Sequence, residues 1–306
     1  MTENRPKLIV ITGPTASGKS SLAVELALHF GGEIINSDSM QVYRGMDIGT
    51  AKPSLRERKG IVHHIIDVVD PDEEFNASIY CGLAGPVIRD IAQRGKVCFL
   101  VGGTGLYIKT LLGGLLKCPP VNPGLREALA GESEKYGSPF LHERLKKLDP
   151  ESAQSIHPND RTRVIRALEI INLTKQSLSS LVLQHNFKDR PFKALKICLQ
   201  VDRDRLYKRI NERSVSMIKS GLLDETQELL KKGYSSKLRA MKSLGYRHAV
   251  EYLRKALNLE ETILQLQRDT RRYSKRQLTW FKADPQMVWV EPGDSEFIKM
   301  KIEEFI

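Results

Sequence analysis

Residues 7–20 read KLIVITGPTASGKS, and this stretch decides the fold. Its first part, Lys7–Thr12, is an apolar run rich in β-branched residues, which is typical of a buried strand. Residues 20–30 have helical spacing and stop at two glycines. The part between them matches the phosphate-binding motif G-x-x-x-x-G-K-[ST] at every position, with the residues Gly13, Pro14, Thr15, Ala16, Ser17, Gly18, Lys19 and Ser20. We therefore predict a strand, a phosphate-binding loop and a helix.

The chemistry of this loop follows from its residue types. Glycines let backbone N–H groups converge on phosphate oxygens, and the start of the helix adds a positive dipole end. Lys19 supplies a positive charge to the terminal phosphates, and Ser20 can ligate Mg²⁺. A chance glycine-rich turn fits the flanking strand and helix poorly. The motif alone leaves open whether the ligand is a nucleoside triphosphate or another diphosphate.

Further apolar runs predict more strands of the same sheet. They cover residues 33–36, 65–69, 97–101, 194–201 and 287–290. Helical patterns over 77–94 and 106–112 lie between them, the first bent or interrupted at Gly85-Pro86. The alternation of fully apolar strands with helices predicts an α/β fold, in which helices cover both faces of a parallel sheet.

The pattern changes after Gly113-Gly114. Residues 118–124 (CPPVNPG) look like a linker, and residues 125–185 show helical periodicity without strand-like runs. The strand pattern resumes after residues 187–191. We therefore predict a sheet domain of residues 1–118 and 191–306, interrupted by an all-helical insertion of residues 119–190.

Composition and charge narrow the class of protein. The 306 residues are 41% hydrophobic, and no apolar run reaches the ~18 residues of a membrane helix, so we expect a globular, cytoplasmic protein. The four cysteines are too widely spaced for zinc knuckles or CxxC redox chemistry. The net charge of +11 is concentrated in residues 201–282, which hold 20 Lys and Arg but 10 Asp and Glu. This segment indicates a nucleic-acid partner, although solvated helix faces would give the same pattern.

Two further motifs follow predicted strands, at the edge where an open α/β sheet has its ligand crevice. Asp38 follows the strand 33–36 and could bind Mg²⁺ or accept a proton from a nucleophile. The string Ser-Asp-Ser is also common in Asx turns and helix N-caps, so a purely structural role of Asp38 explains it equally well. Gly102-Gly103-Thr104-Gly105 follows the strand 97–101, and its N–H groups and the Thr104 hydroxyl could bind leaving-group oxygens or an acceptor. A plain turn into a helix would explain that run as well.

Together these motifs resemble those of one enzyme family, the bacterial tRNA dimethylallyltransferases or IPP transferases. In the family's order, the chain contains GPTASGKS (13–20), INSDSMQVYRGMDIGTAKP (35–53), LVGGTGLY (100–107), HPNDRTRVIRALE (157–169), SLGYR (243–247) and SKRQLTWF (274–281). The resemblance covers nearly the whole chain and implies a P-loop NTPase-like core. It implies transfer of a dimethylallyl group from dimethylallyl diphosphate to N6 of adenosine 37, in tRNAs that read codons beginning with U.

The resemblance also implies roles for individual residues. Asp38 would be the general base, and Thr104 would lie at the reaction centre. Residues 13–20 and Arg213 would bind the donor diphosphate, with Ser20 ligating Mg²⁺. We expect a monomer that binds one tRNA. Contacts with the tRNA anticodon stem–loop are implied for Asp38, Ser39, Met40, Gln41, Thr104, Arg126, Thr162, Arg163, Val164, Ile165, Arg166, Lys242, Gly245, Tyr246 and Arg247.

Several of these positions have a structural alternative. Arg161, Arg163 and Arg166 could be surface charges of a helix instead of RNA contacts. Trp280 and Phe281 could stack on bases, but their place at the end of an amphipathic helix favours the core.

The histidines add little to this assignment. His63, His64 and His157 lack acidic or Cys partners at metal-ligand spacing, so we predict no metal site there. His248 departs from the Gln or Glu expected after GYR in the family.

Three other functions compete with tRNA prenylation. Prenyl transfer to free AMP, ADP or ATP would need neither the insertion nor the concentrated positive charge. A P-loop small-molecule kinase would use Asp38 to activate a hydroxyl and would consume ATP. A non-catalytic RNA-binding protein would not need the intact GKS string together with Asp38 and Thr104.

Overall fold

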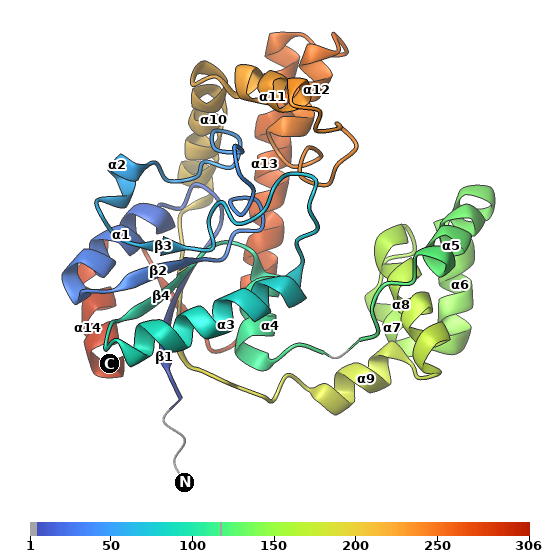
Figure 1. Ribbon diagram of the computed structural model, residues 1–306, viewed down its shortest axis with the longest axis horizontal. Coiled ribbons are helices and arrows are strands. Elements are labelled where there is room, and N and C mark those ends of the chain that lie inside the picture. Colours follow the sequence, from blue (N-terminus) through green and yellow to red (C-terminus); the bar gives the residue numbers. More distant parts are fainter. Residues whose placement is uncertain (1–4, 117) are drawn as a thin grey trace. The chain divides into compact units, whose positions relative to one another are not determined.

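The computed structural model describes residues 5–116 and 118–306, and the chain forms two compact units (Figure 1). The sheet unit consists of the residues up to 112 and residues 191–306, and the helical unit consists of residues 113–190. The helical unit thus begins before residue 119, the start expected for the insertion. In the part of the chain that the structure describes, no helix has both the length and the apolarity needed to cross a membrane.

The sheet unit is built on six parallel strands in the order β3-β2-β4-β1-β5-β6. Along β1, Leu8 and Val10 enter the core on one face, and Ile9 and Ile11 enter the core on the other. Both faces are therefore buried, and the predicted α/β fold is confirmed. The strands are β1 (Lys7–Thr12), β2 (Glu33–Asn36), β3 (His63–His64), β4 (Cys98–Val101), β5 (Lys193–Leu199) and β6 (Val288–Val290).

Helices cover both faces of this sheet. Helices α1 (Lys19–Phe30) and α14 (Ser295–Phe305) pack on the face of Ile9 and Ile11, and α3 (Ala77–Gln93) and α4 (Gly105–Gly113) pack on the other. Helix α3 continues through Pro86, so the expected interruption is wrong. One buried stripe, which stabilises the helix on both sides of the proline, contains Tyr80, Ala84, Ile88 and Ile91.

One predicted strand is also wrong. Residues 65–69 do not join the sheet, because Ile65 and Asp67 have left-handed backbones with φ of 60° and 56°. This segment instead lies beside the loop that comes after β2. The Val68 N–H donates to the carbonyl of Val42 in that loop over 2.8 Å. Its apolar residues pack on that loop, a tertiary contact that an apolar run does not distinguish from strand pairing.

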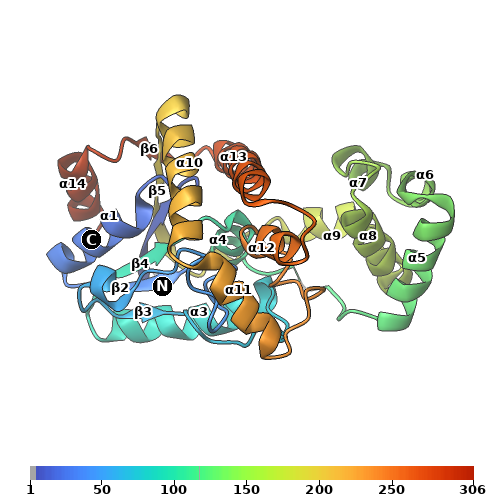
Figure 2. The same ribbon diagram turned by 90° about the horizontal axis from the view of Figure 1, so that it is seen from above.

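Four helices lie over the carboxyl ends of the strands (Figures 1 and 2). They are α10 (Arg203–Lys219), α11 (Leu222–Lys231), α12 (Tyr246–Leu253) and α13 (Leu259–Lys282). Helix α2 (Leu55–Arg58) lies in the long segment between β2 and β3. Of these helices, α10 and α13 hold more basic than acidic residues, so they place positive charge above the edge of the sheet where ligands bind in such folds.

The helical unit has a hydrophobic core of its own. Buried Leu129, Leu141, Leu145, Val164 and Leu168 pack together inside it. Each of these residues comes from a long helix with apolar residues on one face. The unit contains α5 (Pro123–Tyr136), α6 (Ser138–Leu148), α7 (Pro150–Ser155), α8 (Arg161–Thr174) and α9 (Leu178–His185).

Candidate active site

The phosphate-binding loop connects β1 to α1 through two backbone conformations that favour glycine. Gly13 has φ of 146° and Gly18 has φ of 92°. A Cβ atom on Gly13 would also lie 3.2 Å from Leu199. Gly18 is the N-cap of α1 and gives that helix no side-chain cap, so the first N–H groups of α1 are available to an anion.

Two cationic side chains, Lys19 and Arg213, approach this loop. Lys19 donates from Nζ to the carbonyl of Pro14 over 3.3 Å. Burial, and next the charge of Arg213, lowers the pKa of Lys19 to about 8, although Asp38 and Cys198 act in the opposite direction. Burial also lowers the pKa of Arg213, and the structure gives Arg213 no ion-pair partner within residues 5–116 and 118–306. Two poorly neutralised cations beside a helix N-terminus form an anion-binding site.

Asp38 and Thr104 lie at the ends of neighbouring strands and are connected through the backbone. The Asp38 Oδ1 atom accepts the N–H of Met40 at 2.8 Å, so an Asx turn is present. The Thr104 hydroxyl oxygen accepts the N–H of Ser39 at 3.0 Å, and the Thr104 N–H donates to the carbonyl of Ser37. A Cβ on Gly102 would lie 2.2 Å from Ser37, so only glycine permits this contact.

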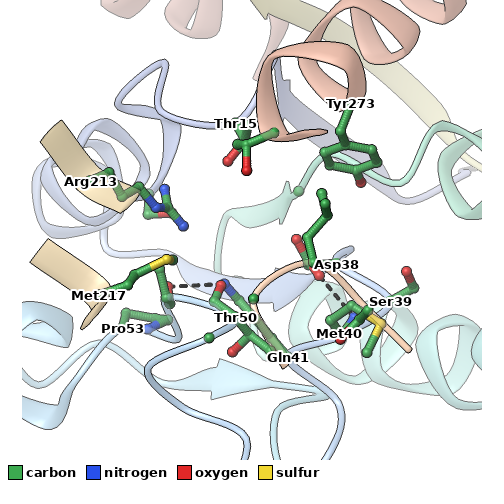
Figure 3. Close-up of a pocket in the computed structure, with 18 of the residues that line it drawn as sticks. Thr15, Asp38, Ser39, Met40, Gln41, Thr50, Pro53, Arg213, Met217 and Tyr273 are labelled. Atoms are coloured by element: carbon green, nitrogen blue, oxygen red, sulfur yellow. Dashed lines mark hydrogen bonds between the residues drawn. The ribbon is translucent and has the colours of Figure 1, made fainter. Parts of the chain in front are cut away.

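A cavity of about 360 Å³ is lined by Lys19, Asp38 and Arg213, whereas Thr104 lies behind the Ser39 backbone and is not part of the lining (Figure 3). Figure 3 shows Arg213 and Met217 on one side of it and Asp38 and Tyr273 on the other. Its wall thus combines the anion site with a carboxylate and an apolar surface. Among the predicted residues, the lining contains Thr15, Lys19, Ser20, Asp38, Ser39, Met40, Gln41, Arg213, Lys242, Gly245 and Arg247, and its apolar part contains Ile66, Ile210, Met217, Leu244 and Leu266.

Glu225 of α11 stabilises the loop that forms another wall of this cavity. Its carboxylate accepts the N–H groups of Asp47, Ile48 and Gly49 at 2.9–3.2 Å and the hydroxyl of Tyr246. Tyr246 is fully buried, so its side chain supports this loop and does not face a ligand.

Lys52 fixes the same loop from within. Its side chain is 3% exposed and binds the carbonyl of Tyr43 and the carboxylates of Asp47 and Asp67. The side-chain amide of Gln41 donates hydrogen bonds to the carbonyls of Thr50 and Ala51 in this loop. The orientation of Gln41 in the cavity therefore depends on polar contacts within this loop.

Asp269 pairs with several basic side chains at the edge of the cavity. It pairs with Arg247 at 2.6 Å, with His248 at 3.3 Å, and with Arg268 and Arg272. Burial alone would raise the pKa of Asp269, but the hydrogen bond from His248 and the neighbouring guanidinium groups lower it. His248 is 2% exposed, and burial lowers its pKa. His248 therefore helps to hold the carboxylate that orients Arg247.

The predicted tRNA-contacting residues of the helical unit differ in accessibility. Val164 and Ile165 are buried in the core of the unit, whereas Thr162 and Arg163 are exposed. Arg126 and Arg166 both pair with the fully buried carboxylate of Glu169, at 3.0 and 2.6 Å. The two arginines thus neutralise a buried charge. The predicted contacts of this unit with tRNA would then be made mainly by its exposed residues. Arg166 also donates to the carbonyl of Pro119.

Several residues that support the site were given no role from the sequence. Lys52 and Gln277 lie within the quoted strings but received no role there, and Glu225, Asp269 and Tyr273 belong to no motif. Of the two aromatic residues predicted for the core, Phe281 is 1% exposed but Trp280 is 40% exposed. Within the described residues, no three His, Cys, Asp or Glu side chains form a group suited to a metal ion.

Comparisons with known proteins agree with the motifs. Residues 41–284 match the family model described as IPP transferase, and residues 6–67 match one described as isopentenyl transferase. The tRNA dimethylallyltransferase of Geobacter sulfurreducens is 50% identical over 94% of this chain and 93% of its own length. The tRNA dimethylallyltransferase of Syntrophobacter fumaroxidans is 48% identical over 96% of this chain and 86% of its own.

Solved structures extend the similarity to the fold. The tRNA isopentenylpyrophosphate transferase from Bacillus halodurans superposes with a TM-score of 0.71 at 41% identity and covers 98% of both chains. A eukaryotic dimethylallyltransferase acting on tRNA superposes with a TM-score of 0.77 at 30% identity, over 97% of this chain and 77% of that one. The resemblance inferred from the motifs is confirmed.

Proposed function

The chain belongs to the IPP transferase family, and we propose that it transfers a dimethylallyl group to tRNA. In its full form, the proposal is that the donor is dimethylallyl diphosphate and the acceptor is N6 of adenosine 37, in tRNAs that read codons beginning with U. The observation that carries it is one cavity that combines an anion site, an apolar wall and a carboxylate. A prenyl diphosphate and an attacking nitrogen need these three features.

The proposed reaction exchanges one bond at carbon for another. The N6 nitrogen attacks C1 of the donor, the C1–O bond breaks, and diphosphate leaves with the bonding electrons. Positive charge develops on the allylic carbon and negative charge on the diphosphate. Lys19, Arg213 and the N–H groups at the start of α1 would stabilise the leaving diphosphate.

Asp38 would accept the proton that N6 loses. The adenine amine is a poor nucleophile because its lone pair is delocalised into the ring, so a base near this proton assists the attack. The contact of Thr104 with Ser39 would fix the backbone that follows Asp38. The hydrogen bond from the Met40 N–H orients one oxygen of the Asp38 carboxylate.

Mg²⁺ is part of the proposal because the donor set suits it. Ser20 and the Asp38 carboxylate line the same cavity as the anion site. Mg²⁺ commonly binds through one or two protein oxygens together with substrate phosphates and water. Ser20 would hold the ion, which would neutralise charge on the diphosphate.

The acceptor would be the anticodon stem–loop, bound by one copy of the protein in the cytoplasm. Unpaired bases of such a loop can leave their stack and enter a cavity. The basic helices α10 and α13 line the cavity, so they would contact phosphates around the target base. The exposed residues of the helical unit would add contacts along the same RNA.

The mass of the product nucleosides tests this proposal. The full chain is incubated with Mg²⁺, dimethylallyl diphosphate and an unmodified anticodon stem–loop containing A36, A37 and A38, and the RNA is then digested. We expect the mass of one dimethylallyl group to be added to one adenosine, and no addition when A37 is replaced by guanosine. Modification of free AMP alone would favour the mononucleotide enzyme. ATP consumption without prenylation would favour a kinase.

A further inference from the structure

Gln277 of α13 connects the phosphate-binding loop to the loop that contains Thr104. Its Oε1 atom accepts the N–H of Thr15 at 2.8 Å, although the two residues are 262 positions apart in the sequence. Its Nε2 atom donates to the carbonyl of Gly103 at 3.1 Å. The residue is 5% exposed, and its hydrogen bond to Gly103 is buried, whereas its hydrogen bond to Thr15 is partly buried.

The partners define the orientation of the amide group. The Thr15 N–H is a donor and the Gly103 carbonyl is an acceptor, so the oxygen of Gln277 must face the first and its nitrogen the second. An aspartate or glutamate carboxylate could accept from Thr15 but could not donate to Gly103. A lysine could donate but could not accept. A side-chain amide of this length satisfies both loops at once.

Gly103 is matched to this side chain. A Cβ atom on Gly103 would lie 2.1 Å from Nε2 of Gln277, far inside van der Waals contact. The next nearest atom outside Gln277 is the Gly13 carbonyl oxygen at 3.6 Å, an ordinary contact. Gly103 has no positive φ, so its backbone would tolerate alanine if Gln277 were absent. The glycine at this position is therefore required by Gln277.

We propose that Gln277 is a positioning residue that aligns the donor diphosphate site with the acceptor site. Thr15 belongs to the loop that would bind the leaving group, and Gly103 precedes Thr104, whose hydroxyl accepts the N–H of the residue after Asp38. The Thr15 N–H is engaged by Gln277, so this part of the loop is fixed before any ligand binds. Because α13 also carries Asp269, the same helix connects both sites to the Arg247 side chain.

Binding of inorganic pyrophosphate tests the first half of this role. The choice of probe rests on the proposed function, but the measurement does not depend on catalysis. By titration calorimetry on the full chain, we expect Gln277→Ala to weaken pyrophosphate binding about tenfold, because the Thr15 N–H loses its buried acceptor. Unchanged pyrophosphate affinity in this variant would overturn the proposal. Prenylation failing in the parent protein would refute the proposed function and leave this result standing.

Gln267→Ala is a matched control on the same helix. Gln267 donates from Nε2 to the carbonyl of Asn211 over 3.3 Å, so its removal also breaks a hydrogen bond from α13 to another element. We expect this variant to bind pyrophosphate as the parent protein does. Equal losses of pyrophosphate affinity in both variants would show that binding only requires α13 to be held against its neighbours. That result would contradict a specific role for Gln277.

A double-mutant cycle tests the contact itself. Gly103→Ala should expel the Gln277 side chain and reproduce the defect of Gln277→Ala, both in pyrophosphate affinity and in the single-turnover rate. The double variant Gly103→Ala with Gln277→Ala should be no worse than either single variant, because the methyl group then occupies vacated space. For tRNA affinity, we expect no change in any of the three. Losses that multiply to about a hundredfold would overturn the proposal.

Discussion

Arginines of the cavity and of the helical unit were both predicted to bind anions, the donor diphosphate in one case and tRNA in the other, but their surroundings differ. Arg213 of the sheet unit lies in the cavity, where the described residues offer it no ion pair. Arg126 and Arg166 of the helical unit share the carboxylate of Glu169, which is completely buried. A half-buried cation without a partner is costly unless a ligand anion compensates for it. A cation paired to a buried carboxylate instead stabilises the folded protein.

This contrast separates residues that act on the substrate from residues that maintain the structure. Substitutions in the cavity should change rates or ligand affinity while leaving the fold intact. Substitutions around Glu169 should lower stability while leaving the chemistry intact.

The largest effect is expected at Asp38. Asp38→Asn retains the shape and the acceptor for the Met40 N–H but cannot accept a proton from N6, so we expect the single-turnover rate to fall by a factor of ~10²–10⁴. The affinity for tRNA, measured by filter binding, should stay within about threefold of the parent protein, since one neutralised carboxylate removes no phosphate contact. A rate close to that of the parent protein would exclude Asp38 as the base.

A smaller but still large effect is expected at Arg213. Arg213→Ala removes a charge that would face the donor diphosphate, so pyrophosphate affinity should fall about 30- to 1000-fold. The melting temperature should not fall, because Arg213 forms no ion pair with any residue that the structure describes.

Arg166→Ala is the counterpart of that experiment in the helical unit. It leaves the buried Glu169 with fewer partners, so the free energy of unfolding should drop by about 1–3 kcal/mol. Pyrophosphate affinity should not change. If Arg213→Ala destabilised the protein, or Arg166→Ala abolished pyrophosphate binding, the division between the two regions would be wrong.

The sequence predicted the sheet and the phosphate-binding loop because both depend on local patterns. The apolar strand followed by G-x-x-x-x-G-K-S needs no distant contact to be recognised. The segment 65–69 was misassigned because its apolar residues pack on a distant loop. The ion pair of Arg166 with Glu169 was not predicted, because the sequence does not reveal that Glu169 is buried.

The supporting residues of the site could not be predicted for the same reason. Gln277 and Thr15 are 262 positions apart and meet in the tertiary structure, and glutamine has no sequence pattern that marks such a contact. Glu225 likewise reaches Asp47, Ile48 and Gly49 from a helix more than 170 residues away. Sequence motifs thus identify the reactive groups, whereas the residues that orient them can be identified only in the tertiary structure.

A pH dependence of about tenfold is expected from Lys19. Its pKa is lowered to about 8, so it is charged below pH 8 and loses its proton above it in the free protein. Diphosphate favours the charged form, so pyrophosphate affinity should be highest below pH 8 and about tenfold weaker at pH 9. Lys19→Arg keeps its charge throughout and corrects for the ionisation of pyrophosphate itself. Parallel profiles for the two proteins would show that Lys19 does not titrate in this range.

The smallest effect is expected at Arg163, and it refines the comparison within the helical unit. Arg163 is exposed, and among the residues that the structure describes it pairs only with Asp160, at 3.4 Å, unlike Arg166. Arg163→Ala should weaken tRNA binding a few-fold and reduce the salt dependence of log Kd by about one phosphate contact, because fewer counterions are released. Its melting temperature should match that of the parent protein, since a surface ion pair contributes little. Filter binding between 50 and 200 mM KCl, roughly the range over which such slopes are measured, gives this slope. An unchanged slope would mean that the exposed face of α8 does not contact RNA.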